Sequence, residues 1–411
     1  MHPVLVRLFP PTPLSRRLSA QSVMFAVGDG TFTTGSAVFF THVVGLSASQ
    51  VGLGLTFAGL VTFVLAVPLG RFADRVGPQR LWAATALVEA LLYLLWPLIS
   101  GFAGFVAMLV ALELVAVAGG AARVAYTLDL FSREERVRTL AFMRSALNIG
   151  FTVGALLGGL ALATNSDAVI RFVPLVTAAI LVVNALLISG LPVAEHGEAS
   201  AGADAPVIPT GALRNRGFLA MNVCDGVLGT HQVLLTVLIP LWLVQETDAP
   251  RVLLAWLFGT NTVLAVLLQV LASRGAETVP GALRASRISA GFFVLSCAVV
   301  SGTHSTIGWL TITLVWLAHV TVTGSELFQS AGHWGLVAEL SDAGRRGEYQ
   351  GAARLGSTVG SVWAPALYTF LAISGGTRGW LVIGAIVAAA AVAITPAAQA
   401  AERFLQQEVA A

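Results

Sequence analysis

Four acidic residues stand inside long apolar stretches of this sequence, where an ionisable side chain is costly and is functional by default. They are Asp29, Asp225, Glu326 and Glu113. A carboxyl group in such a place can take up a proton on one side of a membrane and release it on the other, while a second solute competes for the ionised form. We therefore predict that these residues couple protons to the movement of a solute. Alternatively, Asp29 and Asp225 would have a structural role, as a helix cap or in an ion pair. Arg144 would be the partner of Asp29 in such a pair. Glu326 could instead bind a cationic substrate.

A second and overlapping set of side chains in the same stretches carries groups that a substrate could contact. They are Arg123, His231, Asn261, Glu326 and Trp363. Arg123 has a structural alternative as the neutralising partner of an acid, and Asn261 has one as a hydrogen-bonding link between helices. Glu89 is equally open to a structural explanation, so it is not counted among the candidates.

The composition excludes most classes of protein. Apolar residues make up 56% of the 411 and charged residues 11%, against about 25% charged in soluble domains, and the mean hydropathy is +0.83. A soluble enzyme, a disordered chain and a disulfide scaffold are therefore excluded. The net charge of +2 gives no reason to expect nucleic acid as a partner. The sequence has no metal-binding spacing and no phosphate-binding loop, so we expect no metal, no cofactor and no ATP-driven pump.

The apolar runs predict an all-α integral membrane protein with twelve transmembrane helices, because a span needs about 20 apolar residues. The predicted spans are 18–44, 48–70, 80–101, 103–131, 138–164, 168–192, 216–246, 252–273, 283–302, 306–338, 349–374 and 379–400. Most of the 23 basic residues fall in loops on one side. The positive-inside rule then places both termini in the cytoplasm. We expect the chain in the inner (plasma) membrane.

A segment rich in Ala, Gly and Pro, 193–215, is predicted to be a cytoplasmic linker between six-helix bundles at 1–192 and 216–411. The bundles carry related sequences. Asp29-Gly30 recurs 196 residues later as Asp225-Gly226, and Asp129 has an acidic counterpart 210 residues on in Glu339. Charged residues at equivalent points of equivalent helices indicate an internal duplication. Two parallel six-helix repeats are typical of secondary transporters, with the substrate site at their interface.

The loop after the second span reads Gly70-Arg71-Phe72-Ala73-Asp74-Arg75-Val76-Gly77-Pro78-Gln79-Arg80-Leu81. It resembles the signature loop of the major facilitator superfamily, G-x-L-A-D-R-x-G-R-R/K-x-x-L, although Pro78 and Gln79 replace the usual basic residues. The resemblance implies two pseudo-symmetric bundles, alternating access and a cytoplasmic gate. In that gate Asp74 would cap a helix N-terminus and meet its dipole. Asp129 would pair with Arg75 or Arg80. The predicted gate residues are Gly70, Asp74, Arg75, Gly77, Arg80, Asp129 and Arg144.

The fifth predicted span carries a second signature, made of Gly150, Gly154, Gly158 and Gly159. It resembles the antiporter motif of proton-coupled drug exporters, G-x-x-x-G-P-x-x-G-G, with Ala155 in place of the proline. The alternative is a face of small residues that lets two membrane helices pack closely.

These resemblances imply a secondary transporter and not an enzyme. They favour proton-coupled export of hydrophobic or cationic organic compounds, as in multidrug efflux and antibiotic resistance. The alternatives are a proton-coupled importer of a sugar or other small metabolite, a dedicated exporter of a lipid or natural product, and a membrane receptor or scaffold. The expected partners are the substrate, protons and the lipid bilayer. The chain would act as a monomer, and the proton gradient would stand in place of a cofactor.

Overall fold

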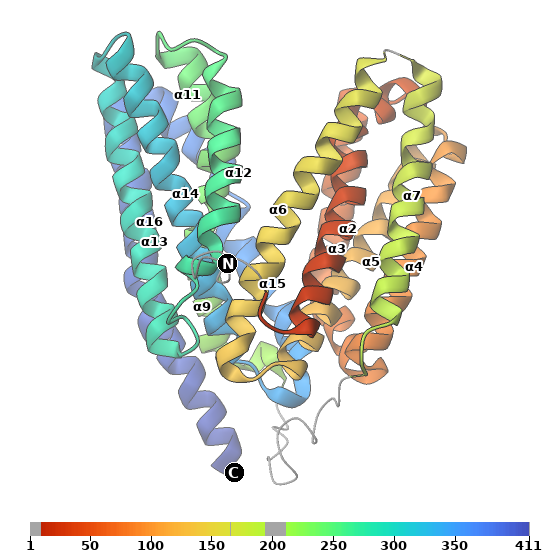
Figure 1. The fold of residues 1–411 in the computed structure, drawn as a ribbon. Coiled ribbons are helices and arrows are strands. Elements are labelled where there is room, and N and C mark those ends of the chain that lie inside the picture. The colour runs from red at the N-terminus through yellow and green to blue at the C-terminus, as the bar shows by residue number, and fades with distance from the viewer. Residues whose placement is uncertain (1–9, 165, 194–210, 411) are drawn as a thin grey trace. The chain divides into compact units, whose positions relative to one another are not determined.

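The computed structural model describes residues 10–164, 166–193 and 211–410, and all regular structure in these residues is helical (Figure 1). This agrees with the predicted all-α class. The first helices are α2 (Pro13–Val38), α3 (Ala48–Val76), α4 (Pro78–Leu95), α5 (Gly101–Leu130), α6 (Arg133–Ala163) and α7 (Asp167–Ser189). After the linker come α9 (Arg216–Leu228), α10 (His231–Val233), α11 (Ile239–Glu246), α12 (Leu253–Ala272), α13 (Val279–Gly302), α14 (Trp309–Glu339), α15 (Arg346–Ser361) and α16 (Ala364–Ala410).

The two ends of α3 show how the sequence sets the helix boundaries. Ser47 and Gln50 cap the start of α3 reciprocally, side chain to backbone. Gly77 has φ +96°, which a glycine adopts without strain, and it ends α3. Pro78 then occupies the first position of α4, where its missing N–H costs no helical hydrogen bond. One residue therefore reverses the chain between two long helices.

Two short π-helices interrupt the helical path at similar points of the two sequence repeats. One covers Phe39–Val43 at the end of α2, and the other covers Leu234–Leu238 between α10 and α11. Their first residues are 195 positions apart, close to the 196-residue offset between Asp29 and Asp225. The duplication seen in the sequence thus extends to an irregularity of the backbone.

Ten helical segments in the described residues are long and apolar enough to cross a membrane, and Trp256–Ala272 is a shorter apolar helix. The last of the ten, Ala343–Glu408, has 66 residues, a length of about 100 Å if fully helical. A bilayer core is only about 30 Å thick, and Gly376, at φ 52° and ψ −134°, breaks the helix inside this segment. The structure thus supports a multi-helix membrane protein. The count of twelve is not confirmed and stays a prediction.

The chain divides into two compact units. Unit 1 takes in the described residues of Met1–Ser132, Phe142–Val207 and Asp342–Gly351, and unit 2 takes in the rest. The predicted bundles at 1–192 and 216–411 differ from these units in two short segments, Arg133–Ala141 and Asp342–Gly351. The boundaries of the bundles stay a prediction, and residues 194–210 of the predicted linker lie outside the described part of the chain.

Each unit has an apolar core between neighbouring helices. In unit 1, α4 packs against both α5 and α7, and these three helices run side by side (Figure 1). Phe32, Phe39 and Phe40 form an aromatic cluster there with Trp96 and Phe105. In unit 2, α13 packs against α14 and α16, and α9 packs against α16.

Candidate functional site

Asp225 is a predicted coupling acid with two side-chain partners in the structure. It lies on α9 in unit 2 and is 2% exposed. Its Oδ2 is 2.6 Å from Nδ1 of His333, and its Oδ1 accepts a hydrogen bond from Nε2 of Gln329 at 2.9 Å. Gln329 and His333 are four residues apart on α14, so both reach the same face of that helix. The carboxylate and the imidazole can hold a shared proton within apolar helices.

Glu326 lies one turn before Gln329 on α14 and is 5% exposed. Nδ2 of Asn261, on α12, donates to Glu326 Oε2 at 3.0 Å and is also 3.1 Å from Thr323 Oγ1. The charge of Glu326 also acts on His319, two turns earlier on α14. The structure therefore joins two predicted substrate residues, Glu326 and Asn261, by a direct hydrogen bond.

The predicted acids of unit 1 lie close to each other. Asp29 on α2 accepts a long hydrogen bond from Thr33, 3.4 Å between oxygens. Its charge interacts with those of Glu113 on α5 and Glu89 on α4. Glu89, for which the sequence left a structural explanation open, thus belongs to the same acidic group as two predicted coupling residues.

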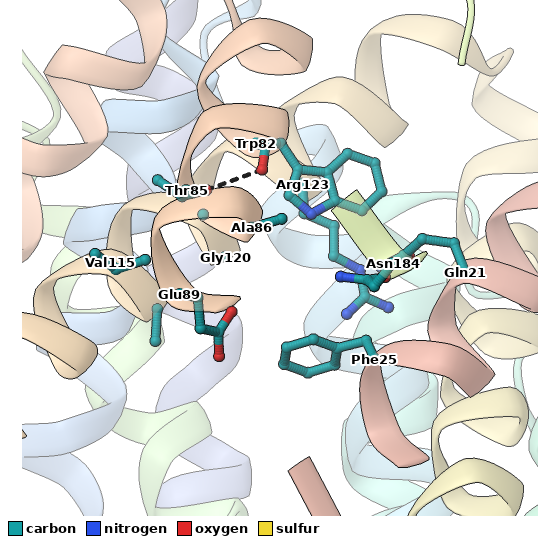
Figure 2. Close-up of a pocket in the computed structure, with 12 residues that line it drawn as sticks. Gln21, Phe25, Trp82, Thr85, Ala86, Glu89, Val115, Gly120, Arg123 and Asn184 are labelled. Atoms are coloured by element: carbon teal, nitrogen blue, oxygen red, sulfur yellow. Dashed lines mark hydrogen bonds between the residues drawn. The ribbon is translucent and has the colours of Figure 1, made fainter. Parts of the chain in front are cut away.

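Arg123 lies on α5 in unit 1, where its Nη2 donates to Ser22 Oγ at 3.0 Å. It lines a cavity with residues of α2, α4 and α7 (Figure 2). In the described residues no ion pair joins it to an acid, and its predicted substrate role and its structural alternative both stay open.

His231 and Trp363, both predicted substrate contacts, have different surroundings in unit 2. His231 is 3% exposed, and its Nδ1 lies 3.1 Å from the carbonyl oxygen of Leu228, three residues earlier. Trp363 stands between α15 and α16 and packs edge-on against Tyr368, with ring centroids 5.6 Å apart. Tyr368 in turn lies 3.1 Å from Thr230 through its hydroxyl.

The predicted cap of Asp74 is present in unit 1. Its Oδ1 accepts from the backbone N–H of Gly347 at 2.7 Å, and its Oδ2 accepts from that of Glu348 at 2.9 Å. These amides belong to the first turn of α15, where the helix dipole favours a negative charge. The approach requires glycine at position 70, because a Cβ there would lie 2.1 Å from the Gly347 carbonyl oxygen.

The predicted partner of Asp129 is wrong. Asp129 pairs with Arg346 at the start of α15, and not with Arg75 or Arg80, whose side chains are exposed. Both side chains of the observed pair are nearly fully buried, whereas the turn at Gly77 directs Arg75 and Arg80 to the surface. Because both charges are buried, the removal of either one alone would leave the other without compensation.

Unit 2 contains the repeat counterpart of this pair. Glu339, the counterpart of Asp129, forms a salt bridge with Arg133, and the charge of Arg136 also acts on it. Arg136 is itself the counterpart of Arg346.

Arg144, predicted as a gate residue, lies in unit 1, where its charge acts on Arg123.

Three of the four glycines of the α6 motif pack against α2 in unit 1. A Cβ at Gly150, Gly154 or Gly158 would lie 2.3–2.5 Å from a carbonyl oxygen of α2. Gly159 faces open space, with nothing within 4 Å. The motif therefore includes the small-residue packing face that was its structural alternative, and its antiporter role stays a prediction.

Sequence reasoning missed several partners. Arg71 forms a salt bridge with Glu348 at 3.0 Å, and Gln21 donates to Asn184 at 2.8 Å. The repeat offset linking Arg136 to Arg346 was the available signal for the Asp129 pair. No comparable signal marks Gln21 and Asn184, which are single polar residues on helices far apart in the chain. The described residues hold no cluster of His, Cys, Asp and Glu able to bind a metal ion.

Comparisons with known proteins agree with this fold. The family model described as Major Facilitator Superfamily matches residues 18–333, while none of the curated proteins compared with the chain matches it. A bacterial homologue of the iron transporter ferroportin, in the outward-facing state, is 14% identical, with 94% of this chain and 100% of that chain covered and a TM-score of 0.70. The human organic anion transporter MFSD10 (TETRAN) is 15% identical, with 93% and 100% covered and a TM-score of 0.64. The transporter FucP in the outward conformation is 14% identical, with 95% and 99% covered and a TM-score of 0.71. At such identities the likeness shows the fold alone. Because the family model spans well over half of the sequence, the chain belongs to the Major Facilitator Superfamily.

Proposed function

We propose that this transporter exports hydrophobic or cationic organic compounds in exchange for protons, by alternating access. The contact that carries the proposal is the 2.6 Å approach of Asp225 to His333 within apolar helices. An imidazole next to a carboxylate can hold a proton, and loss of that proton leaves a buried negative charge that a cation or a new proton can neutralise. Such a pair supplies the two states that coupling requires.

The acidic and aromatic side chains of unit 2 support a cationic or hydrophobic substrate. Glu326 is held by Asn261 in unit 2, and Trp363 packs against Tyr368 in the same unit. Carboxylates attract cations, and aromatic faces bind them further through the ring quadrupole. We propose Glu326, Asn261 and Trp363 as substrate contacts and Asp29 and Glu113 as further coupling acids.

The contacts around Asp74 support the proposed gate. A cap of two backbone amides and a buried Asp129–Arg346 pair are polar contacts that can form in one state of the cycle and break in another. We also propose twelve spans, with the segment Ala343–Glu408 crossing twice, and a monomer in the inner membrane with both termini in the cytoplasm.

Proton-coupled import of a small metabolite is the second candidate. Solved structures of the same fold include a fucose:proton symporter and a proton:xylose symporter, each 12% identical over most of this chain. In those two proteins protons and sugar move in the same direction. Import is therefore a second possible direction of transport for this chain. A dedicated exporter of a lipid or natural product is a third form of the same mechanism.

The test is substrate-triggered proton movement in proteoliposomes with an imposed pH gradient. The panel contains organic cations, neutral drugs and sugars, and the variants are Asp225→Asn and His333→Gln. The matched control is Glu402→Gln, which alters an exposed carboxylate in the last helix. We expect protons to move opposite to a drug or cation, with the response lost in both pair variants and kept in the control. Proton and sugar movement in the same direction would replace export by import. Folded protein that moves no proton with any compound would contradict the coupling.

A further inference from the structure

Unit 1 contains a partly open cavity of about 180 Å³ between α2, α4, α5 and α7 (Figure 2). Its polar lining comes from Gln21, Glu89, Arg123 and Asn184. Aromatic walls come from Phe25 and Trp82. Drug-sized ligands occupy pockets of about 300–1,000 Å³, so this cavity suits something smaller than the compounds of the proposed export.

Two opposite charges face this cavity without meeting. Glu89 makes no hydrogen bond or ion pair with any residue that the structure describes, and Arg123 bonds only to Ser22. Figure 2 shows the Glu89 carboxylate apart from the Arg123 guanidinium, with Gln21 and Asn184 on the Arg123 side. Both side chains are only partly exposed, and a charge that is largely removed from water without a partner is unfavourable. A bound molecule with a positive group at Glu89 and a negative group at Arg123 would therefore compensate both charges.

A second charge of the same sign acts on the charged group at each end of the cavity. The charge of Asp29 acts on Glu89, and that of Arg144 acts on Arg123. One end of the cavity is thus an acidic pole and the other a basic pole. Such a field orients a dipolar molecule and does not favour a simple cation or a simple anion.

A buried acceptor without a hydrogen bond lies on the Arg123 side of the cavity (Figure 2). Gln21 is 1% exposed and donates through Nε2 to Asn184 Oδ1, but its own Oε1 has no hydrogen-bond partner. Buried polar atoms in native structures are nearly always bonded to protein, water or ligand. Gln21 also lines the cavity, so its amide group belongs to the polar surface near Arg123.

We propose that this cavity binds a small zwitterion of the amino-acid type, with its ammonium group at Glu89 and its carboxylate at Arg123. One water molecule occupies about 30 Å³ in the liquid, so a cavity of 180 Å³ has the volume of roughly six water molecules. A molecule of that order of size, with an aliphatic side chain against Phe25 and Trp82, fits the space. The inference goes beyond the proposed function, because binding here requires neither a proton gradient nor a direction of transport.

Equilibrium binding of tritiated L-leucine to purified protein in nanodiscs tests the proposal without any transport. We expect saturable binding that unlabelled L-alanine and L-leucine displace. Isocaproate, which lacks the ammonium group, and isopentylamine, which lacks the carboxylate, should bind at least about tenfold more weakly, since each leaves a buried charge unpaired. This comparison on the unaltered protein needs no variant to fold.

Two substitutions then assign the poles. Glu89→Gln should weaken leucine but not isocaproate, and Arg123→Gln should weaken leucine but not isopentylamine. Glu402→Gln and Arg403→Gln, the same changes at exposed positions of α16, should leave leucine binding as it was. The proposal is overturned if no zwitterion binds saturably, if the singly charged analogues bind as well as leucine, or if both cavity variants bind leucine normally. Failure of the proton-coupling test would leave these results untouched.

Discussion

At the scale of single residues, Asp225 depends on His333 and Gln329 for its polar contacts. Breaking a buried pair from one side costs about 3–5 kcal/mol, because the remaining charge has no partner, whereas removing both charges costs much less. We expect His333→Leu to lower the thermal unfolding midpoint markedly. The double variant Asp225→Asn/His333→Leu should recover much of the loss. Unfolding in detergent of the wild type, both single variants and the double variant measures this coupling. Additive losses would mean that the two groups do not stabilise each other.

Asp342 gives a prediction for pH. It lies outside the membrane-length helices, and burial raises the pKa of its carboxyl group above the ordinary 3.8, although a hydrogen bond from the Gly344 amide opposes this. The folded state thus holds the proton more tightly than the unfolded state. The contribution of Asp342 to stability therefore falls as pH rises through its folded-state pKa. Asp342→Asn does not titrate and keeps a side chain that can cap the turn.

We expect Asp342→Asn to unfold at a higher temperature than the wild type at about pH 7, and the difference to shrink towards about pH 4. Differential scanning fluorimetry across this range measures the effect. Glu402→Gln, on an exposed carboxylate, should change the profile little. A difference between variant and wild type that does not vary with pH would count against the effect of burial on Asp342.

At the scale of helices, the contact of α6 with α2 depends on small residues. A Cβ at Gly154 would lie 2.3 Å from the Val27 carbonyl oxygen, so Gly154→Ala forces the helices apart. At Gly159 a Cβ meets nothing within 4 Å, and alanine there gains about 1 kcal/mol of helix propensity. We expect Gly154→Ala to lower the unfolding midpoint and Gly159→Ala to keep or raise it. Equal effects in the two variants would show that the motif does not serve packing.

The helices were more predictable than the contacts between them. Apolar runs and turn residues such as Gly77 and Pro78 were enough to predict where the early helices lie, because membrane helices satisfy their own backbone. The Asp74 cap was predictable because the family resemblance specifies it. The partner of Asp129 was missed because Arg75 and Arg80 belong to the signature loop, although the repeat offset between Arg136 and Arg346 pointed to Arg346. Gln21 and Asn184 meet across 163 residues of chain, a pairing that no local pattern encodes.

At the scale of the whole molecule, the Asp74 contact joins segments more than 270 residues apart in the chain. Two amides of the first turn of α15, those of Gly347 and Glu348, donate to this one carboxylate. An asparagine side chain offers a single oxygen acceptor and no charge. It therefore loses one of the two hydrogen bonds and the interaction with the helix dipole, which is typically worth about 0.3–1 kcal/mol.

Hydrogen exchange measures this contact directly, because an amide exchanges only when its hydrogen bond opens. We expect Asp74→Asn to speed exchange several-fold in peptides that cover Gly347 and Glu348. The matched control is Asp248→Asn, since Asp248 accepts in the same way from the amide of Gly308 at 2.6 Å. That variant should speed exchange near Gly308 and leave α15 unchanged. If the contact opens and closes during transport, a bound substrate or an imposed pH change should also alter exchange at Gly347 and Glu348 in the wild type. The same conditions should have little effect in Asp74→Asn, where the cap is already weakened. Exchange at α15 that is the same in wild type and Asp74→Asn under every condition would exclude Asp74 from the gate.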